Sequence, residues 1–377
     1  MKIACIASST IPSTTANSIQ VMKVCQALRQ VNGPVRLWVP GDQGTDWTQL
    51  ADFYGLSTPF EVQWIETRRV WKRYDLAWKS VGLAQRWGAT LIYTWMLQSA
   101  VLALWRGFPV ILELHDRPSG RLGTRLFREF IRYPGRKRLL VITEALLERV
   151  QQQYHWLPSQ DMVQIAPNGT ELERYANLPR PEEARRLLGL PQTLTVVYSG
   201  SFYTGRGLDL LLQLAHDFPT VLFLWVGGRP QDILEWKNRL NNMGLRNVHL
   251  TGFVENSRLP LYQAAGDVLL MPYEQAISGS SGGNSAEICS PMKMFDYLAC
   301  GRPILASDLP VFHEVLNERN AVFCPPQDSV AWSKALELLL KDADRRQRLG
   351  KQAKADAARY TWRSRAERAL SEFSILP

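Results

Sequence analysis

Short apolar runs rich in β-branched and aromatic residues alternate with longer helical runs, and this order limits the fold more than any other feature of the sequence. In the first half, strands are expected near 2–8, 35–39, 61–65, 90–93, 108–113, 138–142 and 162–166. Helices are expected near 18–30, 70–87, 96–106, 120–133 and 144–154. A strand, a helix and a further strand form a parallel pair, and repeated units of this kind place helices on both faces of a sheet. The sequence therefore predicts an α/β protein with a doubly wound parallel sheet.

A stretch rich in proline and charge, at 166–192, interrupts this alternation and is typical of a domain boundary. Beyond it, strands are expected in LTVVYSGS, TVLFLWVGG, VHLTGFV, DVLLMPY and PILAS. Helices are expected at 207–215, 230–242, 257–265 and 291–300, followed by a helical tail. With 377 residues and 46% hydrophobic content, the chain is long enough for two cores. We expect two Rossmann-like domains, 1–178 and 179–358, facing a cleft, and a final helical segment, 359–377.

The five cysteines are scattered, form no CxxC pair and have no metal-type spacing with the five histidines. Free thiols in a reducing compartment are the better interpretation. The first residues, MKIACIASSTIPS, predict a strand and lack the long apolar stretch of a signal peptide. No apolar run approaches the ~18–20 residues of a spanning helix. We therefore expect a cytoplasmic protein, either soluble or peripheral on the inner face of a membrane.

The formal net charge of +9 is concentrated in residues 66–138. Arg121, Arg125, Arg128 and Arg132 follow one another at steps of four, three and four, which places them on one stripe of a helix. Tryptophans and phenylalanines lie among these basic residues, and such helices suit an anionic membrane surface. The alternative is that the apolar residues face the core and the arginines simply face solvent. No RNA- or DNA-binding module is present, so no nucleic-acid partner is expected.

Two loops of the second half have residues suited to an anion. In VVYSGSFYTGRGLDLLLQLA, a strand ends at Gly200 and Arg206 precedes a helix, whose free amides and dipole favour phosphate. In GGNSAEICSPMKMFDYLACGRP, we expect Ser290 to cap a helix that Pro291 begins, with Lys293 beside its unpaired amides. The alternatives are an ordinary strand-to-helix loop in the first case and a surface pair of Lys293 with Asp296 in the second.

Two loops of the first half are also candidates. The polar stretch ASSTIPSTTANS follows the first strand, and Asn17 or Ser18 is expected to cap the next helix. Hydroxyl or anion recognition there is as plausible as capping alone. In VILELHDRPSG, Glu113, His115 and Asp116 stand at the end of an apolar strand, at the sheet edge where ligands of doubly wound folds bind. A single histidine of this kind is otherwise hydrogen-bonded within its loop.

Five segments taken in order resemble a known family, the retaining family 4 glycosyltransferases of GT-B fold. The segments are TANSIQVMKVCQAL; ELHD; VITEALLERV leading to IAPNGTELERY; YSGSFYTGRGLDLLLQLA; and GFVENSRLPLYQAAGDVLLMPY leading to SPMKMFDYLACGRPILAS. The last helical stretch, YTWRSRAERALSEF, resembles the family's C-terminal helix that crosses back to the first domain. The likeness covers nearly the whole chain.

The resemblance implies a nucleotide-diphosphate sugar as the donor and assigns a role to individual residues. Asp296 would hold the ribose, Arg206 and Lys293 the diphosphate, and His115 the donor sugar near the reacting carbon, with His115, Arg206 and Lys293 as the catalytic set. The implied donor site consists of Gly200, Ser201, Arg206, Glu255, Asn256, Glu287, Ser290, Pro291, Met292, Lys293 and Asp296. The implied acceptor or sugar side consists of Thr15, Asn17, Ser18 and Asp116.

The sequence departs from the family's pattern at two positions. Many members have an acid that contacts the sugar at the position of Ile288, and Glu287 lies one residue away. Either the loop shifts so that Glu287 serves, or amides and hydroxyls from Asn284 to Ser290 hold the sugar, as in the branch with an "SP-K" motif that lacks this acid. Ser201 stands where many members have an arginine.

The expected function is hexose transfer from a UDP- or GDP-sugar to a glycan or lipid-linked acceptor, with retention of configuration. Cations and helix dipoles would stabilise the charge on the departing diphosphate, so no metal or other cofactor is expected. An anionic membrane surface is the expected partner of residues 66–138. The alternatives are a catalytically weak, membrane-associated partner subunit of the same fold, and a GT-B sugar epimerase or phosphorylase.

Overall fold

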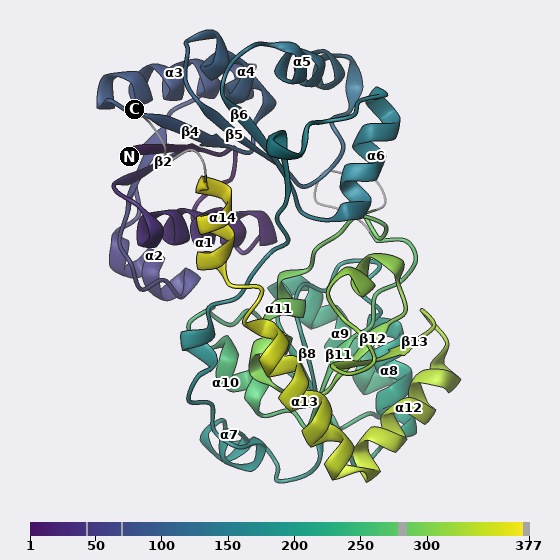
Figure 1. The fold of residues 1–377 in the computed structure, drawn as a ribbon. Helices are drawn as coiled ribbons and strands as arrows, with labels where there is room; N and C mark the ends of the chain where they lie inside the picture. Colours follow the sequence, from purple (N-terminus) through teal and green to yellow (C-terminus); the bar gives the residue numbers. More distant parts are fainter. Residues whose placement is uncertain (43, 69–70, 278–284, 372–377) are drawn as a thin grey trace. The chain divides into compact units, whose positions relative to one another are not determined.

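The computed structural model describes residues 1–42, 44–68, 71–277 and 285–371 (Figure 1). The chain forms two compact units. The first unit comprises Met1–Asn168 and the C-terminal segment from Trp362, and the second unit comprises Gly169–Thr361. The first break therefore lies before the expected position at 178, and the second lies after the expected position at 358. Each unit contains one parallel sheet, and the expected α/β fold of two doubly wound domains is confirmed.

The first unit contains a seven-stranded sheet in the order β3-β2-β1-β4-β5-β6-β7. Its strands are β1 (Ile3–Ile6), β2 (Val35–Pro40), β3 (Glu61–Ile65), β4 (Leu91–Thr94), β5 (Val110–Leu114), β6 (Lys137–Val141) and β7 (Val163–Ile165). Its helices are α1 (Ala16–Val31), α2 (Trp47–Tyr54), α3 (Lys72–Trp87), α4 (Leu97–Trp105), α5 (Gly120–Arg132), α6 (Glu144–Tyr154) and α14 (Trp362–Leu370). Strands β1 and β4 are buried along their whole length, as expected for strands covered on both faces.

The second unit contains a six-stranded sheet in the order β10-β9-β8-β11-β12-β13. Its strands are β8 (Thr195–Ser199), β9 (Leu222–Val226), β10 (Val248–Leu250), β11 (Val268–Met271), β12 (Ile304–Ser307) and β13 (Ala321–Cys324). Its helices are α7 (Pro181–Leu187), α8 (Leu208–Asp217), α9 (Pro230–Asn242), α10 (Leu259–Ala264), α11 (Met292–Cys300), α12 (Ser329–Lys341) and α13 (Ala343–Ala357). Leucines and aromatic side chains form its core, where Trp225 packs edge-on against Trp236 with ring centres 5.3 Å apart.

The strand order in each unit determines which loops meet. In the second sheet the order reverses direction between β8 and β11, which are hydrogen-bonded neighbours. The loops that leave the carboxyl ends of such a pair diverge and leave room for a ligand between them. These two loops lead to Arg206 and to Lys293. The topology of the second unit therefore brings together the two cations that the sequence had singled out.

Candidate functional site

Glycines allow the loops after β8 and β11 to pack closely. Gly207 has a φ of 69°, and a Cβ atom added to it would lie 1.8 Å from the carbonyl oxygen of Pro272. Gly200 has a φ of 146°, and a Cβ there would lie 2.6 Å from the Nζ atom of Lys293. A larger residue at either position would displace its neighbours. Gly207 therefore serves the packing of the two loops, and Gly200 makes room for the lysine.

Lys293 lies on the first turn of α11 with its ammonium group between aromatic rings. Its Nζ atom lies 3.8 Å from the centre of the Tyr198 ring and 5.3 Å from that of Tyr273. Nζ is buried and has no hydrogen-bond partner in the part of the chain that the structure describes. Burial foremost, and then the charge of Arg206, hold the pKa of Lys293 well below its usual value. The cation is thus contacted by aromatic faces but by no acceptor.

Arg206 contributes a second cation to the same place. Its guanidinium carbon lies 4.7 Å from the centre of the Tyr273 ring. Burial disfavours the charged form and is the largest single effect, but Tyr273, Tyr198 and Cys289 together outweigh it, and the pKa of Arg206 lies above its usual value. Among the described residues, no carboxylate forms an ion pair with Arg206 or Lys293. Two neighbouring cations without a counter-charge favour binding of an anion.

The start of α11 differs from the expectation. Pro291, with φ −66° and ψ 125°, is the N-cap residue, and the helix begins at Met292. The expectation that Ser290 caps the helix is therefore wrong by one residue, and Ser290 is buried instead. The amide hydrogens of Met292 and Lys293 have no acceptor within residues 1–42, 44–68, 71–277 and 285–371. Two free amides and the positive end of the helix dipole thus point out beside the Lys293 ammonium.

Asp296 lies one turn further along α11 and does not form the surface pair with Lys293. Its Oδ1 atom accepts a hydrogen bond of 2.9 Å from the Thr170 hydroxyl. Burial and then the charge of Asp296 raise the pKa of Tyr175 well above its usual value. Asp296 therefore faces the segment that opens the second unit. Thr170 and Tyr175 were not identified from the sequence, because only the tertiary fold brings them to α11.

The same segment contacts Asn256, which belongs to the implied donor site. The Arg174 guanidinium donates to the Asn256 carbonyl oxygen and, over 3.3 Å, to its side-chain oxygen. Arg174 also forms an ion pair of 3.4 Å with Glu171. Glu255, the neighbour of Asn256, is exposed. Arg174 thus fixes the loop after β10 and leaves the Glu255 side chain on the surface.

The structure describes the surroundings of Ile288, Glu287 and Ser201, where the sequence departs from the family's pattern. Ile288 is 4% exposed, whereas Glu287 is exposed. The Ser201 carbonyl oxygen accepts a hydrogen bond of 2.7 Å from the Tyr198 hydroxyl. The suggested sugar contacts that begin at Asn284 lie partly outside the described residues, which resume at Ser285. An acid therefore stands on the surface beside a buried isoleucine.

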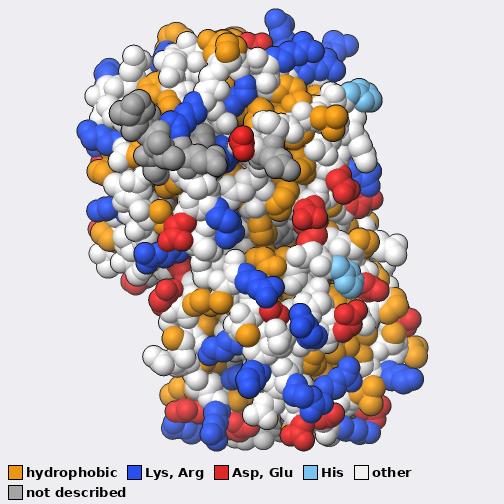
Figure 2. Space-filling model, viewed as in Figure 1, with side chains coloured by type: hydrophobic (Ala, Val, Ile, Leu, Met, Phe, Trp, Pro, Cys, Tyr) orange, Lys and Arg blue, Asp and Glu red, His pale blue; other side chains and the backbone are white. Residues whose placement is uncertain are grey.

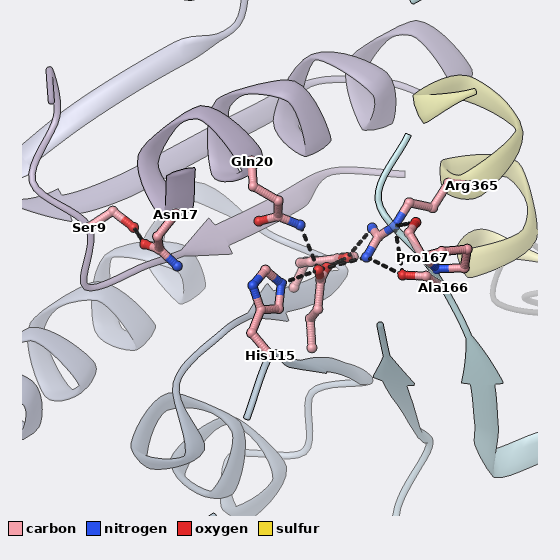
Figure 3. A network of polar contacts seen from close by, with 9 residues as sticks. Ser9, Asn17, Gln20, His115, Ala166, Pro167 and Arg365 are labelled. Carbon is pink, nitrogen blue, oxygen red and sulfur yellow. Dashed lines mark hydrogen bonds and ion pairs between the residues drawn. The ribbon is translucent and has the colours of Figure 1, made fainter. Parts of the chain in front are cut away.

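In the first unit, His115 follows β5 and contacts a buried acid, Glu113, to which the sequence assigned no role. Its Nε2 atom lies 2.7 Å from Oε1 of Glu113 (Figure 3). Burial raises the pKa of Glu113, but Arg365, His115 and Tyr93 outweigh it, and the pKa is lowered to about 2. Glu113 is therefore a carboxylate that can only accept hydrogen bonds.

The remaining candidates of the first unit make local contacts. Thr15 is the N-cap of α1 and accepts from the Ser18 amide over 3.3 Å, so the expectation that Asn17 or Ser18 caps this helix is wrong. The buried Ser18 hydroxyl donates to the Ser13 carbonyl over 2.6 Å, and Asn17 accepts from the Ser9 hydroxyl. Asp116 is exposed and accepts from the Arg117 amide over 2.7 Å.

Two further features concern metals and membranes. Within the described ranges, no group of three or more His, Cys, Asp or Glu side chains is arranged to hold a metal ion. None of the described helices combines the length and the apolar character that crossing a membrane would require.

Comparison with known proteins places these features in context. Residues 193–342 match the family model described as glycosyl transferases group 1. The chain is 26% identical over 256 residues to D-inositol 3-phosphate glycosyltransferase of Corynebacterium urealyticum, a match that covers 63% of this chain and 57% of that protein. It is 26% identical over 163 residues to alpha-galactosylglucosyldiacylglycerol synthase of Streptococcus pneumoniae, covering 41% and 40%. The chain thus spans between 40% and 57% of the length of these two relatives.

Solved structures resemble the chain over its whole length. Sucrose-phosphate synthase from Thermosynechococcus elongatus superimposes with a TM-score of 0.75 at 19% identity, covering 99% of this chain and 98% of that one. Anabaena HepE in complex with UDP-glucose superimposes with a TM-score of 0.75 at 17% identity, covering 100% of both chains. The chain therefore has the two-domain GT-B fold, and residues 193–342 of its second unit match the glycosyl transferases group 1 family.

Proposed function

We propose that the chain is a glycosyltransferase that moves a hexose from a UDP- or GDP-sugar to a glycan or lipid-linked acceptor with retention of configuration. The observation that carries this proposal is the Lys293 ammonium, which is buried without an acceptor beside Arg206 in the described part of the second unit. A buried unpaired cation is unfavourable unless a ligand supplies the missing charge. A nucleoside diphosphate supplies two phosphates to match the two cations and the free amides of α11.

Departure of the diphosphate from the sugar accumulates negative charge on the leaving phosphate. Arg206, Lys293 and the N-terminus of α11 are fixed before the reaction and stabilise that charge in the transition state. We therefore propose that transfer requires no metal. Asp296 is the proposed ribose contact, since its carboxylate only accepts hydrogen bonds and a ribose presents hydroxyl groups that donate them. His115 is the proposed contact of the donor sugar.

For the acceptor side, we propose contact with an anionic membrane surface through residues 66–138. Trp78 on α3 is 64% exposed and Leu122 on α5 is 62% exposed. Helix α4 packs against both α3 and α5, so these side chains lie on the two helices that flank α4. Figure 2 shows Lys and Arg side chains gathered over the end of the first unit that α5 forms, with hydrophobic side chains beside them. The arginines of α5 are exposed, whereas Phe127 and Phe130 are buried and belong to the core.

This proposal places the protein at the inner face of a membrane. Five free cysteines support a reducing compartment. The Streptococcus pneumoniae relative is by name a diacylglycerol glycolipid synthase, which supports a lipid-linked acceptor. Exposed tryptophan and leucine beside arginine match the composition of helices that lie in the membrane interface.

The experiment combines the purified protein with UDP-, GDP- and ADP-sugars and measures released nucleotide with and without a lipid acceptor. Release that depends on the acceptor, with one preferred nucleotide, is the expected result. Asp296→Ala should weaken nucleotide binding, and Arg206→Ala should slow transfer more than it weakens nucleoside binding. If the protein binds none of these nucleotides, the proposal is wrong. If both variants behave like the wild type, the diphosphate site is wrongly placed.

Two positions favour a second candidate, a partner subunit of the same fold with little turnover. Ile288 is buried at the position where many members of the resembling family have an acid, and Ser201 replaces a common arginine. Nucleotide binding without release, for every acceptor tested, would support this candidate over the first.

A further inference from the structure

Glu113 is a buried acid of the first unit to which the proposed function assigns no role. It lies at the end of β5, is 1% exposed and accepts four hydrogen bonds (Figure 3). Its Oε1 atom accepts from Gln20 Nε2 over 2.6 Å, from His115 Nε2 over 2.7 Å and from Arg365 Nη2 over 2.6 Å. The Tyr93 hydroxyl donates to Oε2. Gln20, Tyr93 and Arg365 are buried, whereas His115 is partly exposed.

The charge of Glu113 determines the direction of every hydrogen bond around it. Its pKa is lowered to about 2, so at physiological pH the group is a carboxylate without a proton to donate. Each partner must therefore supply a hydrogen atom. For His115, this places a proton on Nε2.

The amide of Gln20 provides independent support for this reading. Gln20 is 1% exposed, and its NH2 group faces Glu113. Its Oε1 atom is buried and has no donor among the residues that the structure covers. An unpaired buried oxygen costs about 1–3 kcal/mol, so the amide keeps this orientation only because the carboxylate requires a donor.

Arg365 holds the carboxylate in place from the C-terminal helix. Besides Glu113, it donates to the Ala166 carbonyl over 3.1 Å, the Pro167 carbonyl over 3.0 Å and the Tyr93 hydroxyl over 3.2 Å. The guanidinium therefore cannot move without breaking several hydrogen bonds. Helix α14 is therefore connected through one side chain to the acid that contacts His115.

A neutral imidazole with its proton on Nε2 has a lone pair on Nδ1. In Figure 3 the second ring nitrogen of His115 lies on the side of the ring away from Arg365. Within the described part of the chain, Nδ1 has no hydrogen-bond partner, and the side chain is 27% exposed. Nδ1 can therefore accept a hydrogen bond from a ligand hydroxyl.

We propose that Glu113, fixed by Arg365 of α14, is a positioning residue that keeps His115 in the Nε2–H tautomer and presents Nδ1 as the acceptor for a sugar hydroxyl. The sugar as the ligand rests on the proposed function, whereas the tautomer rests on the contacts of Glu113 alone. The C-terminal helix thereby takes part in preparing the site although it contacts no ligand.

The test is a two-bond 15N–1H spectrum of the full-length protein, labelled with 15N-histidine and free of ligand, at about pH 8, where free imidazole is neutral. The signals of His115 are those that disappear in His115→Gln. We expect the nitrogen shifts of a protonated Nε2 and an unprotonated Nδ1. The opposite tautomer, or an equal mixture, would overturn the proposal without any variant of Glu113 having to fold.

Variants then separate positioning from a structural role. Glu113→Gln offers both a donor and an acceptor, so we expect a mixture of tautomers and a fall in kcat of about tenfold, the effect of one weakened hydrogen bond. Arg138→Gln is the matched control, because Arg138 is a buried arginine that binds the other end of α14 through the Arg368, Ala369 and Ser371 carbonyls. It should lower the Tm and leave the tautomer unchanged.

The outcomes for the two proposals are distinguishable, because the spectrum requires no activity. The expected tautomer in a protein that transfers no sugar would overturn the proposed function and leave the positioning role standing. Active protein with the opposite tautomer would overturn the positioning role alone. A change of tautomer in Arg138→Gln as large as in Glu113→Gln would show that docking of α14, and not Glu113, determines the tautomer of His115.

Discussion

Lys293 combines two properties that oppose each other, burial and charge. Its Nζ atom lies over the Tyr198 and Tyr273 rings, and Gly200 leaves space for it. The aromatic faces attract the cation but do not replace the hydrogen bonds of water. Because the pKa of Lys293 is lower in the folded chain than in the unfolded chain, the unfolded state binds more protons between the two values, and stability rises with pH across that interval.

Lys293→Met should therefore stabilise the protein in the absence of ligand. We expect a gain of about 1–3 kcal/mol in the free energy of unfolding at neutral pH, since a buried unpaired group is removed. The gain should decrease as the pH rises toward 10.5, the usual value of lysine. Thermal unfolding over this pH range measures it. Lys341→Met, which removes an exposed lysine, is the control and should change little; a loss of stability in Lys293→Met would contradict the account of burial.

Binding of a nucleoside diphosphate should take up a proton. The phosphates stabilise the charged form of Lys293, so its pKa rises on binding. Calorimetry with UDP in buffers of different ionisation enthalpy should reveal proton uptake in the wild type and none in Lys293→Met. The variant should also bind about 10- to 100-fold more weakly, the effect of losing one charge-assisted hydrogen bond. Identical proton uptake in both proteins would place the titrating group elsewhere.

At the scale of residues, the sequence predicted the two cations, Arg206 and Lys293, but not the side chains that surround them. Arg206, Lys293 and Asp296 stand in loops and helix starts whose local pattern is informative. Glu113 was placed beside His115 at the end of its strand but given no role, because its partners Gln20 and Arg365 lie 93 and 252 positions away in the sequence. The cap of α11 was misplaced by one residue, because local preference does not decide between two adjacent residues when one of them is proline.

At the scale of elements, the alternating pattern predicted the order of most strands and helices in both units, since apolar runs of four to six residues must be buried in a parallel sheet. Helix α2 was missed because it is only eight residues long, although Asp46 caps its start and Gly55, with φ 63°, ends it. Strand β13 was not predicted, because its residues were included in the expected helical tail. Helix α5 shows why the basic stripe was ambiguous: Phe127 and Phe130 face the core, whereas Leu122 on the same helix is exposed.

The arginines of α5 permit a direct test of membrane contact. Reversing three exposed charges, Arg121→Glu, Arg125→Glu and Arg128→Glu, should abolish flotation with anionic vesicles. At about 1 kcal/mol for each basic residue near such a surface, the partition coefficient should fall by at least about 100-fold. The matched control reverses Arg348, Lys351 and Arg359 of the second unit, which are also exposed and change the net charge equally. An equal loss of flotation in both triple variants would show that the net charge of the protein, and not the position of the arginines on α5, governs binding to the vesicles.

At the scale of the whole chain, the first unit is built from two separated stretches. The second unit is continuous, whereas the first unit requires α14, which follows it in the sequence. Two buried arginines secure this helix, Arg365 at Glu113 and Arg138 at the α14 carbonyls. The helix is therefore an internal part of the first unit's core.

A chain that ends at Thr361 should lose stability in the first unit alone. Removing Arg365 leaves Glu113 as a buried charge without its partner, which costs about 3–5 kcal/mol. UDP binding by the second unit should persist, because Arg206, Lys293 and Asp296 lie within Gly169–Thr361. Limited proteolysis and calorimetry measure the two effects. A chain that ends after Ser371 retains α14 and is the control; loss of UDP binding in the shorter chain would contradict the independence of the donor site.

Because α14 belongs to the first unit but follows the second unit in the sequence, it also determines the order in which the two units can finish folding during synthesis. Glu113 leaves the ribosome 252 residues before Arg365, which at about 5–20 residues per second is a wait of roughly 10–50 s. During that time the second unit can complete its sheet, since all of its strands lie in one continuous stretch of the sequence, Gly169–Thr361. In the nascent N-terminal half, by contrast, the Glu113 carboxylate lies among apolar strands without Arg365, the cation that pairs with it in the folded unit. The half that is translated first is thus the half that is finished last.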